Sequence, residues 1–464
     1  MLNKRQRTMM PAQVLTLGFV IIIIIGTVLL MLPAASAAGQ WTDPLTALFT
    51  ATTSVCVTGL VTVPTYSHWS VAGQWIILLL VELGGLGFMT FATMAILVAG
   101  RRVTLKRKLL IQEALSQNTP GGVTQLVRQV FFGTFLVQGA GALLLALRFC
   151  PEYGLARGIY YGIFHSISAF CNAGLDILGP DSLIPYAGDT YVNTVVVLLI
   201  VLGGLGYVVW LDVCKALREA YKPSRALRRY CYIRRVWRHC SLYSKLVLTM
   251  TAGLILLGWL GFIGMEWNNP ETLGGMPIAE RLQAAFFQSV TTRTAGFAGI
   301  AQGGLTDNSK VLSSILMFIG GSSGGTAGGI KTVTVAVMLL TIGSYIRGHG
   351  DVEVFGRRIA PSAVRRAFSL GICAFLLGIL FTMVIGGIEG LPFVDVLFEV
   401  ASAIGTTGLS VGITAGLTPL SQALLILLMY IGRLGPLTVM MALKIRQEES
   451  RTNVRCPEEE VMIG

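Results

Sequence analysis

Long apolar runs that are almost free of charge dominate the pattern of hydrophobic and polar positions along this chain. Each run is close to the length of about 20 residues that a helix needs to cross the hydrocarbon core of a bilayer. The pattern therefore predicts an all-α integral membrane protein. Examples of these runs are Val14–Leu32, Gln74–Ala99, Val192–Asp212, Leu246–Gly264, Ala367–Gly387 and Ser421–Leu443.

Between the runs, one short pattern occurs four times: a Phe stands ten residues before a Gly, and a large apolar residue follows that Gly. The four glycines are 115, 122 and 112 residues apart. A fixed period of this kind indicates internal repeats. The copies start at Phe49, Phe164, Phe286 and Phe398, and they end in Val57-Thr58-Gly59, Asn172-Ala173-Gly174, Thr294-Ala295-Gly296 and Thr406-Thr407-Gly408.

Each repeat is interpreted as a long helix, a half-helix too short to cross a membrane, a strand that ends in the Gly, and a second long helix. Four such M1–P–M2 repeats predict eight transmembrane helices and four pore half-helices in pseudo-fourfold symmetry around one pore. The predicted repeats are residues 1–100, 101–220, 221–350 and 351–445, followed by a cytoplasmic tail at 446–464. The predicted first helices are 14–32, 126–149, 244–264 and 364–387, the half-helices 43–54, 158–170, 278–291 and 393–404, and the second helices 73–99, 191–215, 310–345 and 421–443.

The distribution of charge sets the expected orientation. The chain has 464 residues, a net charge of +12 and 12% charged residues, against roughly 25% in soluble domains. Lys and Arg gather in alternating loops, which places both termini in the cytoplasm by the positive-inside rule and does not indicate nucleic-acid binding. The basic segments are the N-terminus, Arg101–Arg128, Lys215–Lys245, Arg347–Arg366 and the tail from Lys444, and the acidic loops between them hold Asp43, Glu152, Asp176, Asp181, Asp189, Glu266, Glu271, Asp307 and Glu389.

Two local patterns suggest other interpretations that their spacing disfavours. The first apolar run follows basic residues as in a signal peptide, but a cleaved signal has an apolar core of only about 7–15 residues. We therefore expect an uncleaved first helix. Cys231, His239 and Cys240 fit no zinc spacing, and the eight cysteines form no CxxC pair.

The four Gly-ended strands have the chemistry of a cation selectivity filter. A ring of backbone carbonyls can replace the hydration shell of an ion, and Gly adopts backbone angles that a Cβ disfavours. The half-helices would direct their partly negative C-termini toward the same cavity. The segments expected to supply the carbonyls are 55–59, 170–174, 292–296 and 404–408.

The third repeat departs from the others because six glycines occur within ten residues at 320–329. Each Gly destabilises a helix by about 1 kcal/mol relative to Ala. We expect this second helix to break in mid-membrane beneath the filter, leaving a loop suited to gating. A phosphate-binding loop is disfavoured because Ile330 separates the last Gly from Lys331 and no strand precedes the segment. The predicted gate residues are Gly320, Gly321, Ser322, Ser323, Gly324, Gly325, Thr326, Gly328, Gly329, Lys331 and Arg433.

Two arginines are expected at membrane depth, where ionisable groups are costly and usually functional. Arg293 lies inside the third strand, and we expect it to point away from the pore, held by backbone carbonyls or by Glu399 or Glu82. A purely structural ion pair is an equal alternative. Arg433 falls in the middle of the predicted helix 421–443, where it would place an electrostatic barrier below the filter, and Lys331 would compete with the permeant cation in the same cavity.

The four strands, the broken helix and the segment Ile431-Gly432-Arg433-Leu434-Gly435-Pro436 together resemble the Trk/Ktr/HKT potassium transporter superfamily over essentially the whole chain. The size is most similar to the bacterial KtrB membrane subunit. The resemblance implies Gly59, Gly174, Gly296 and Gly408 as filter glycines, 320–329 as the gating loop and Arg433 as a pore arginine. Gln138 departs from the resemblance, which implies a Glu there.

The same resemblance implies a function. It predicts potassium uptake across the inner membrane, with K⁺ held by the filter carbonyls, Na⁺ as a second candidate ion, and no bound cofactor. It also implies symport, stimulation by sodium, a homodimer surrounded by membrane lipid, and control by a cytosolic KtrA/TrkA-type ring of nucleotide-binding subunits.

Three alternatives compete with potassium uptake. A sodium-permeable relative is disfavoured because the sodium-preferring plant members carry Ser in the first filter, where this chain has Gly59. An intramembrane enzyme would need clustered catalytic side chains, yet of the four histidines only His165 could lie near membrane depth. An inverted-repeat carrier would need two repeats of opposite orientation, whereas these four share one. We expect a transporter and not an enzyme.

Overall fold

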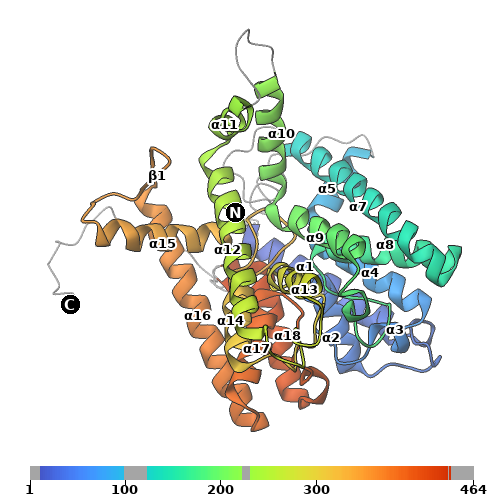
Figure 1. Cartoon of the computed structure of the whole chain (residues 1–464). Helices are drawn as coiled ribbons and strands as arrows, with labels where there is room; N and C mark the ends of the chain where they lie inside the picture. Colours follow the sequence, from blue (N-terminus) through green and yellow to red (C-terminus); the bar gives the residue numbers. More distant parts are fainter. Residues whose placement is uncertain (1–10, 99–122, 222–229, 437, 440–464) are drawn as a thin grey trace, which may run out of the picture.

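The computed structural model describes residues 11–98, 123–221, 230–436 and 438–439, and this part of the chain is predominantly helical. The two strands in it, β1 (Glu353–Val354) and β2 (Arg357–Arg358), form one antiparallel hairpin. Figure 1 shows β1 beyond α15 (Thr332–Ile346), away from the packed helices. The predicted helical class is confirmed.

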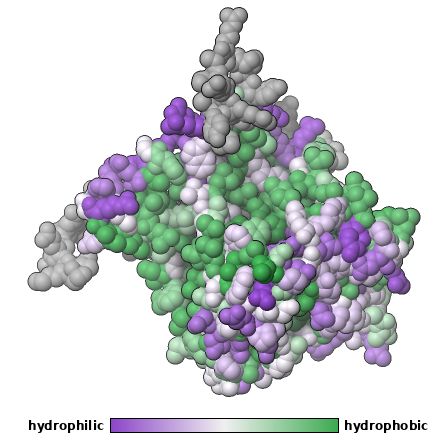
Figure 2. Space-filling view, viewed as in Figure 1, coloured by the Kyte–Doolittle hydropathy of each residue, from purple (hydrophilic) through white to green (hydrophobic). Residues whose placement is uncertain are grey.

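Four long apolar helices follow the predicted first helices closely. Among the described residues, these four are long and apolar enough to cross a membrane singly, and a fifth span results if one bent pair is counted as one. Large apolar side chains on their outer faces are exposed, such as Leu257 at 53% and Leu376 at 60%. Figure 2 shows hydrophobic side chains over much of this face. The long helices are α1 (Pro11–Met31), α7 (Val123–Tyr153), α12 (Leu242–Glu266) and α16 (Pro361–Glu389).

A short helix follows each long one and ends at one of the Gly-ended strands. Asp43 caps the first of them: its carboxylate accepts hydrogen bonds from the backbone N–H groups of Leu45 and Thr46, and Pro44 is the first residue of the helix. Asp at the N-cap and Pro in the first turn both favour a helix start. The short helices agree with the predicted half-helices to within three residues: α2 (Pro44–Val55), α8 (Leu155–Cys171), α13 (Ile278–Thr291) and α17 (Phe393–Gly405).

The second helices differ from the prediction, because all four are interrupted and not only the third. The prediction of uninterrupted helices at 73–99, 191–215 and 421–443 is wrong. Gly87, Gly206 and Gly435 stand at the three unexpected breaks with φ of 77°, 86° and 86°, a conformation that ends a helix and that Gly adopts readily. The pieces are α4 (Val71–Gly85) and α5 (Phe88–Val98), α9 (Thr190–Leu205) and α10 (Tyr207–Tyr221), α14 (Asp307–Phe318) and α15, and α18 (Pro419–Leu434).

The break in the third repeat is confirmed. Residues 319–331 separate α14 from α15, and a single parallel bridge joins Ile319 to Ile330 at the base of the loop. In the second repeat, α9 and α10 bend by 98° about Gly206. The remaining short elements are η1 (Pro33–Ala35), α3 (Thr65–His68), η2 (Ile184–Tyr186), α11 (Tyr230–His239) and η3 (Thr414–Gly416).

The core gathers around the short helices. The repeated Phe is fully buried in three copies, at Phe49, Phe164 and Phe398. In the third copy Phe286 is 37% exposed and Phe287 takes the buried position at 1%. The buried Phe of the third repeat therefore stands nine residues before its Gly and not ten, because the chain between α13 and that Gly makes a tighter turn.

Candidate functional site

The four repeated glycines meet in a closed ring, here called the glycine ring (Gly59, Gly174, Gly296 and Gly408). Each faces the carbonyl oxygen of the residue that precedes the next ring glycine, so closely that a Cβ would fall within 3.0 Å of that neighbour. No side chain fits at any of these positions without moving the backbone. The contacts run from Gly59 to Ala173, from Gly174 to Ala295, from Gly296 to Thr407 and from Gly408 to Thr58.

The backbone around the ring has the same unusual shape in every copy. The ring glycines have φ of 98°, 63°, 86° and 95°. The residue two positions earlier is also left-handed, with φ of 55° at Val57, 59° at Asn172, 65° at Thr294 and 49° at Thr406. Positive φ is costly for β-branched residues. Its recurrence at one position of every strand marks a backbone held in place by its surroundings.

Hydroxyl groups at the ends of the short helices hold the strands. Thr53 Oγ1 accepts from Gly59 N at 2.9 Å, and Ser402 Oγ accepts from Gly408 N at 3.0 Å. Ser168 and Thr291 instead donate to the carbonyls that follow their ring glycines, at 2.6 and 2.7 Å. Sequence reasoning missed these four residues, although each belongs to the hydroxyl-rich end of a predicted half-helix.

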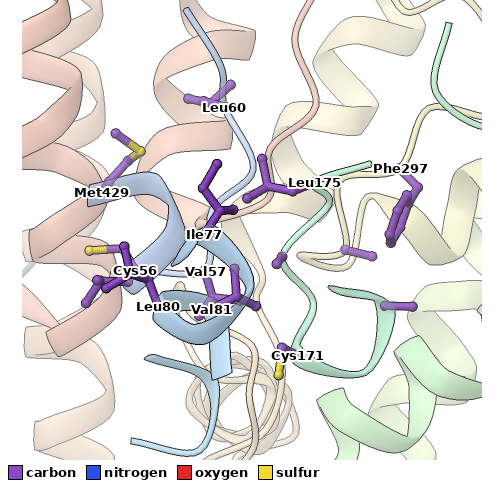
Figure 3. Close-up of a cluster of buried hydrophobic side chains, with 14 of the residues drawn as sticks. Cys56, Val57, Leu60, Ile77, Leu80, Val81, Cys171, Leu175, Phe297 and Met429 are labelled. Atoms are coloured by element: carbon purple, nitrogen blue, oxygen red, sulfur yellow. The ribbon is translucent and has the colours of Figure 1, made fainter. Parts of the chain in front are cut away.

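A cavity of about 330 Å³ opens on one side of the ring and is lined by all four ring glycines. Asp176, two residues beyond Gly174, is the acidic residue in its lining, and Gln302, Ser410 and Tyr66 add polar groups. We call this cavity the vestibule. Burial raises the pKa of the Asp176 carboxyl from 3.8 to about 6. Figure 3 shows Leu60 and Leu175, the apolar residues that follow two ring glycines, and both belong to the same buried cluster as Ile77.

The Gly-rich loop lies on the opposite side of the strands from the vestibule, against residues that precede the ring glycines. Thr326 Oγ1 donates to the carbonyl of Phe170 at 3.1 Å. A Cβ on Gly328 would collide with the side chain of Thr406, and one on Gly329 would lie 3.2 Å from the carbonyl oxygen of Gly405. The loop therefore packs directly against strands of the second and fourth repeats.

The loop is also tied to the second repeat by its backbone. Ser322 N donates to Gly204 O at 3.0 Å, and Thr326 N donates to Gly203 O at 3.2 Å. Tyr243 on α12 donates its hydroxyl to Ser323 O at 2.7 Å. A segment rich in glycine is thus held in one conformation by neighbouring elements.

Arg433 joins this loop to the first repeat. Its guanidinium donates to the carbonyls of Thr326 and Gly84, and to that of Gly85 at 3.2 Å. Because α18 ends at Leu434, Arg433 lies in the last turn of its helix and not in the middle of a longer one. The prediction that Arg433 lies in the middle of a helix spanning 421–443 is wrong. The structure does bring Arg433 to the Gly-rich loop.

The other two predicted cations are held by backbone carbonyls. Lys331 Nζ donates to Ala327 O at 2.7 Å, so its ammonium folds onto the loop. Arg293 Nη2 donates to Gly320 O at 3.2 Å, which agrees with a role for backbone carbonyls. The carboxylate partners proposed for Arg293 are wrong: Glu399 accepts from Ser410, Thr414 and the backbone of Val411, while Glu82 accepts from Gln138 and Cys171.

Comparisons with known proteins agree with this architecture. The family model TrkH, described as a cation transport protein, matches residues 2–454. The chain is 39% identical to the Ktr system potassium uptake protein B of Bacillus subtilis, over 98% of this chain and 97% of that protein. It is 38% identical to the potassium/sodium uptake protein NtpJ of Enterococcus hirae, over 100% of this chain and 99% of that one.

A solved structure extends the likeness to the fold. The crystal structure of the potassium transporter TrkH from Vibrio parahaemolyticus superposes with a TM-score of 0.68, at 15% identity, covering 96% of this chain and 87% of that one. At this identity the superposition bears on the fold alone. Full-length similarity, the apolar helices and the shared fold together lead to one conclusion: this chain is a multi-pass membrane transporter that belongs to the TrkH family of cation transport proteins.

Proposed function

We propose that this chain mediates potassium uptake across the inner membrane, with the glycine ring as its selectivity filter. The observation that carries the proposal is the closed ring, in which each glycine faces a backbone carbonyl of the next strand. Two relatives named as potassium uptake proteins support K⁺ as the ion. The residues proposed to bind K⁺ through backbone carbonyls are Val57, Thr58, Gly59, Asn172, Ala173, Gly174, Thr294, Ala295, Gly296, Thr406, Thr407 and Gly408.

The physical basis is exchange of hydration for carbonyl oxygens. A cation entering from the vestibule loses water and gains carbonyl dipoles from four strands. The four short helices end at these strands, so their C-terminal partial charges favour a cation at the ring. The left-handed residues at the same position of each strand are consistent with carbonyls that alternate in direction along it.

The layout proposed around this filter is four M1–P–M2 repeats with pseudo-fourfold symmetry, each second helix being broken. Four long helices, four short helices and the order of contacts in the ring support it. Both termini are proposed to face the cytoplasm, because the basic loops alternate with acidic ones along the chain.

The gate is proposed to be the Gly-rich loop with Arg433 and Lys331. The loop packs beneath two strands, and Arg433 bridges it to the first repeat, so the path below the ring is occupied in this conformation. Opening requires the loop to leave the carbonyls of Gly203 and Gly204 that now hold its backbone.

A cytosolic nucleotide-binding regulator, a homodimer and stimulation by sodium complete the proposal. The name "Ktr system", carried by relatives of this chain, implies more than one component. The surfaces proposed for docking, Lys106–Arg128 and Lys222–Arg238 with the tail, lie largely outside the described residues.

Ion flux into proteoliposomes tests the filter. We expect Rb⁺ uptake by the wild type, and a loss of about tenfold in preference for K⁺ over Na⁺ in Gly59→Ser or Gly296→Ser, equivalent to about 1.4 kcal/mol. The added Cβ would displace the facing carbonyl. Gly39→Ser is the matched control, because Gly39 also has a positive φ of 67° but nothing lies within 4 Å of its Cβ position. Unchanged selectivity in both ring variants would remove the ring from ion selection.

A sodium-permeable transporter is the second candidate function. The name of the Enterococcus hirae relative, potassium/sodium uptake protein, favours testing it. The same liposomes decide between the two: equal Na⁺ and Rb⁺ fluxes by the wild type would replace potassium uptake with general monovalent cation uptake.

A further inference from the structure

The buried carboxylate of Glu399 lies on α17, the short helix of the fourth repeat, and neither the proposed filter nor the proposed gate uses it. It is 2% exposed. Its two oxygens accept three hydrogen bonds from the segment that follows the ring glycine of the same repeat. Ser410 Oγ donates to Oε1 at 2.5 Å, Val411 N donates to Oε1 at 3.1 Å, and Thr414 Oγ1 donates to Oε2 at 2.8 Å.

This arrangement of donors suits a carboxylate and no other side chain of that length. An ionised carboxylate accepts at both oxygens and donates nothing, so it can receive two hydroxyl groups and one backbone N–H at the same time. The amide of a Gln would instead present a donor to one of these hydroxyl groups. Hydrogen bonds to an ionised acceptor are also stronger than neutral ones. The segment 410–414 is therefore tied firmly to α17.

The tied segment begins at the vestibule. Gly408, Leu409 and Ser410 all line this cavity. Before the ring glycine, Ser402 on the same helix accepts from Gly408 N at 3.0 Å. Gly408 is thus held by α17 from both directions along the chain, by Ser402 at its own N–H group and by Glu399 through Ser410 two residues later.

The second repeat has a buried polar side chain in the same place. His165 on α8 stands nine residues before its ring glycine, as Glu399 does before its own. His165 Nε2 accepts from Ile177 N at 3.4 Å. Ile177 and Val411 each stand three residues after their ring glycines. Two short helices therefore hold the backbone at one equivalent position beyond the ring.

The third repeat uses two amides at this level. Gln288 on α13 donates to Gln302 Oε1 at 2.7 Å, and Gln302 donates back to Gln288 Oε1 at 3.0 Å. Gln288 stands eight residues before Gly296, in keeping with the tighter turn of this repeat, and Gln302 lines the vestibule. Of His165, Gln288 and Glu399, only Glu399 is acidic.

We propose that Glu399 is a positioning residue for the outer end of the filter, which sets the affinity for K⁺ by holding the fourth strand at Gly408. The inference rests on the proposed function of the glycine ring. Carbonyls that are already fixed in place lose little conformational entropy when an ion binds, whereas carbonyls on a loose segment must be ordered at the expense of affinity. The carboxylate acts through the segment 410–414 and does not need to touch the ion.

Kinetics of Rb⁺ uptake into proteoliposomes separate this role from a purely structural one. We expect E399Q to raise the KM for Rb⁺ about tenfold, as the loss of one charge-assisted hydrogen bond allows, and to leave Vmax nearly unchanged. S410A removes one of the three donors and should raise the KM about threefold. The double variant should have the KM of E399Q alone, because both changes act on one network. Effects that multiply in the double variant would overturn the proposal.

The matched control is D395N. Asp395 lies one turn earlier on α17, and its ion pair with Lys310 at 2.7 Å joins this helix to α14 and not to the strand. D395N should therefore keep the wild-type KM for Rb⁺, even where it lowers the thermal unfolding midpoint. A rise in KM as large as that of E399Q would assign the effect to general loosening of α17 and overturn the proposal.

A binding measurement covers a variant that transports poorly. K⁺ should raise the unfolding midpoint of the purified wild type, and E399Q should need about tenfold more K⁺ for the same shift. S410A leaves the carboxylate and its two other contacts in place, so it serves if E399Q does not fold. Absence of Rb⁺ uptake by the wild type would overturn the proposed function. Uptake by the wild type, with an unchanged KM in E399Q and S410A, would overturn this inference alone.

Discussion

At the scale of single residues, four acidic groups hold the ends of helices. Asp43 and Asp189 accept from the first backbone N–H groups of α2 and α9. Glu266 and Glu389 accept from Thr306 and Thr418, which precede α14 and α18. These carboxylates have structural partners, whereas Asp176 lines the vestibule, where a negative charge would attract cations.

External pH should therefore control uptake through Asp176. Its pKa of about 6 means that the carboxyl is neutral below that value and negative above it. We expect the initial rate of Rb⁺ uptake to rise roughly threefold as external pH increases through 6 at low ionic strength, because a negative vestibule concentrates cations. Asp176→Asn should remove this rise, so that the initial rate of Rb⁺ uptake stays at its low-pH value across the whole pH range.

The matched control is Asp181→Asn. Asp181 is exposed and does not line the vestibule. Its variant should keep the wild-type pH profile. A profile that persists in Asp176→Asn would assign the titration to another group.

The pKa of Asp176 also has a consequence for folding. The folded-state value lies above the ordinary 3.8, so the folded state binds more protons than the unfolded state between these values. The contribution of Asp176 to the free energy of unfolding is then fully present below about pH 4 and is lost as pH rises through 6. Acid should stabilise the vestibule through this residue, which is opposite in sign to its effect on uptake.

At the scale of elements, the third repeat differs from the others in two related ways. Its strand turns one residue sooner after the short helix, since Ala295 N donates to Thr291 O whereas Thr58 N donates to Thr53 O. Its second helix is replaced at the same level by the Gly-rich loop. The asymmetry gives one quarter of the molecule a segment that can move without disrupting a helix.

Deleting Ser322–Thr326 should raise the Rb⁺ flux and leave K⁺ over Na⁺ selectivity nearly unchanged. The deletion removes the carbonyl that Arg433 binds and the hydroxyl that bonds to Phe170, but none of the ring carbonyls. The measurement is flux in proteoliposomes together with gel filtration of the purified variant. A correctly folded deletion that conducts less than the wild type would make the loop a brace and not a gate.

Arg433→Gln should also raise the Rb⁺ flux, but by less than the deletion of Ser322–Thr326 does. Hydrogen bonds from a charged group contribute about 1.5–3 kcal/mol, so losing part of them would shift a closed loop toward opening by about tenfold. Arg347→Gln, on an exposed residue after α15, is the control. Equal fluxes in the two variants would show that Arg433 does not hold the loop closed.

At the scale of the whole molecule, the described part of the chain is a bundle of helices around one ring, joined on one side to the break between α14 and α15. Figure 1 shows α15 leaving the bundle sideways, with the β1 hairpin at its far end. A partner that pulls on α15 would act directly on the loop, because Lys331 is the residue before the first turn of that helix.

A cytosolic regulator should therefore change the flux through nucleotide binding. We expect purified protein alone to conduct slowly, and the addition of a Ktr-type nucleotide-binding partner with ATP to raise Rb⁺ uptake by about tenfold or more. The measurement compares liposomes with and without partner and ATP. Full flux that is insensitive to both would remove the regulator from the mechanism.

The apolar and glycine patterns alone determined much of this protein. Bilayer length fixes the long helices, and the end of α13 at Thr291 and the start of α17 at Phe393, directly after Pro392, agree with the predicted bounds. The break at 320–329 was also predictable, since six glycines cannot sustain a helix. The site's glycines could be found because their period survives in the chain.

Only the tertiary structure decided which groups meet. No local pattern shows that Gly59 faces Ala173, that Arg433 reaches Gly84, or that Gln138 and not Arg293 contacts Glu82. These pairs join residues far apart in the chain, and their contacts depend on how four repeats close around one axis. The breaks at Gly87, Gly206 and Gly435 were missed because Gly and Pro are tolerated inside membrane helices, although Gly87 and Gly206 each close a run of three glycines in four residues and Pro436 follows Gly435.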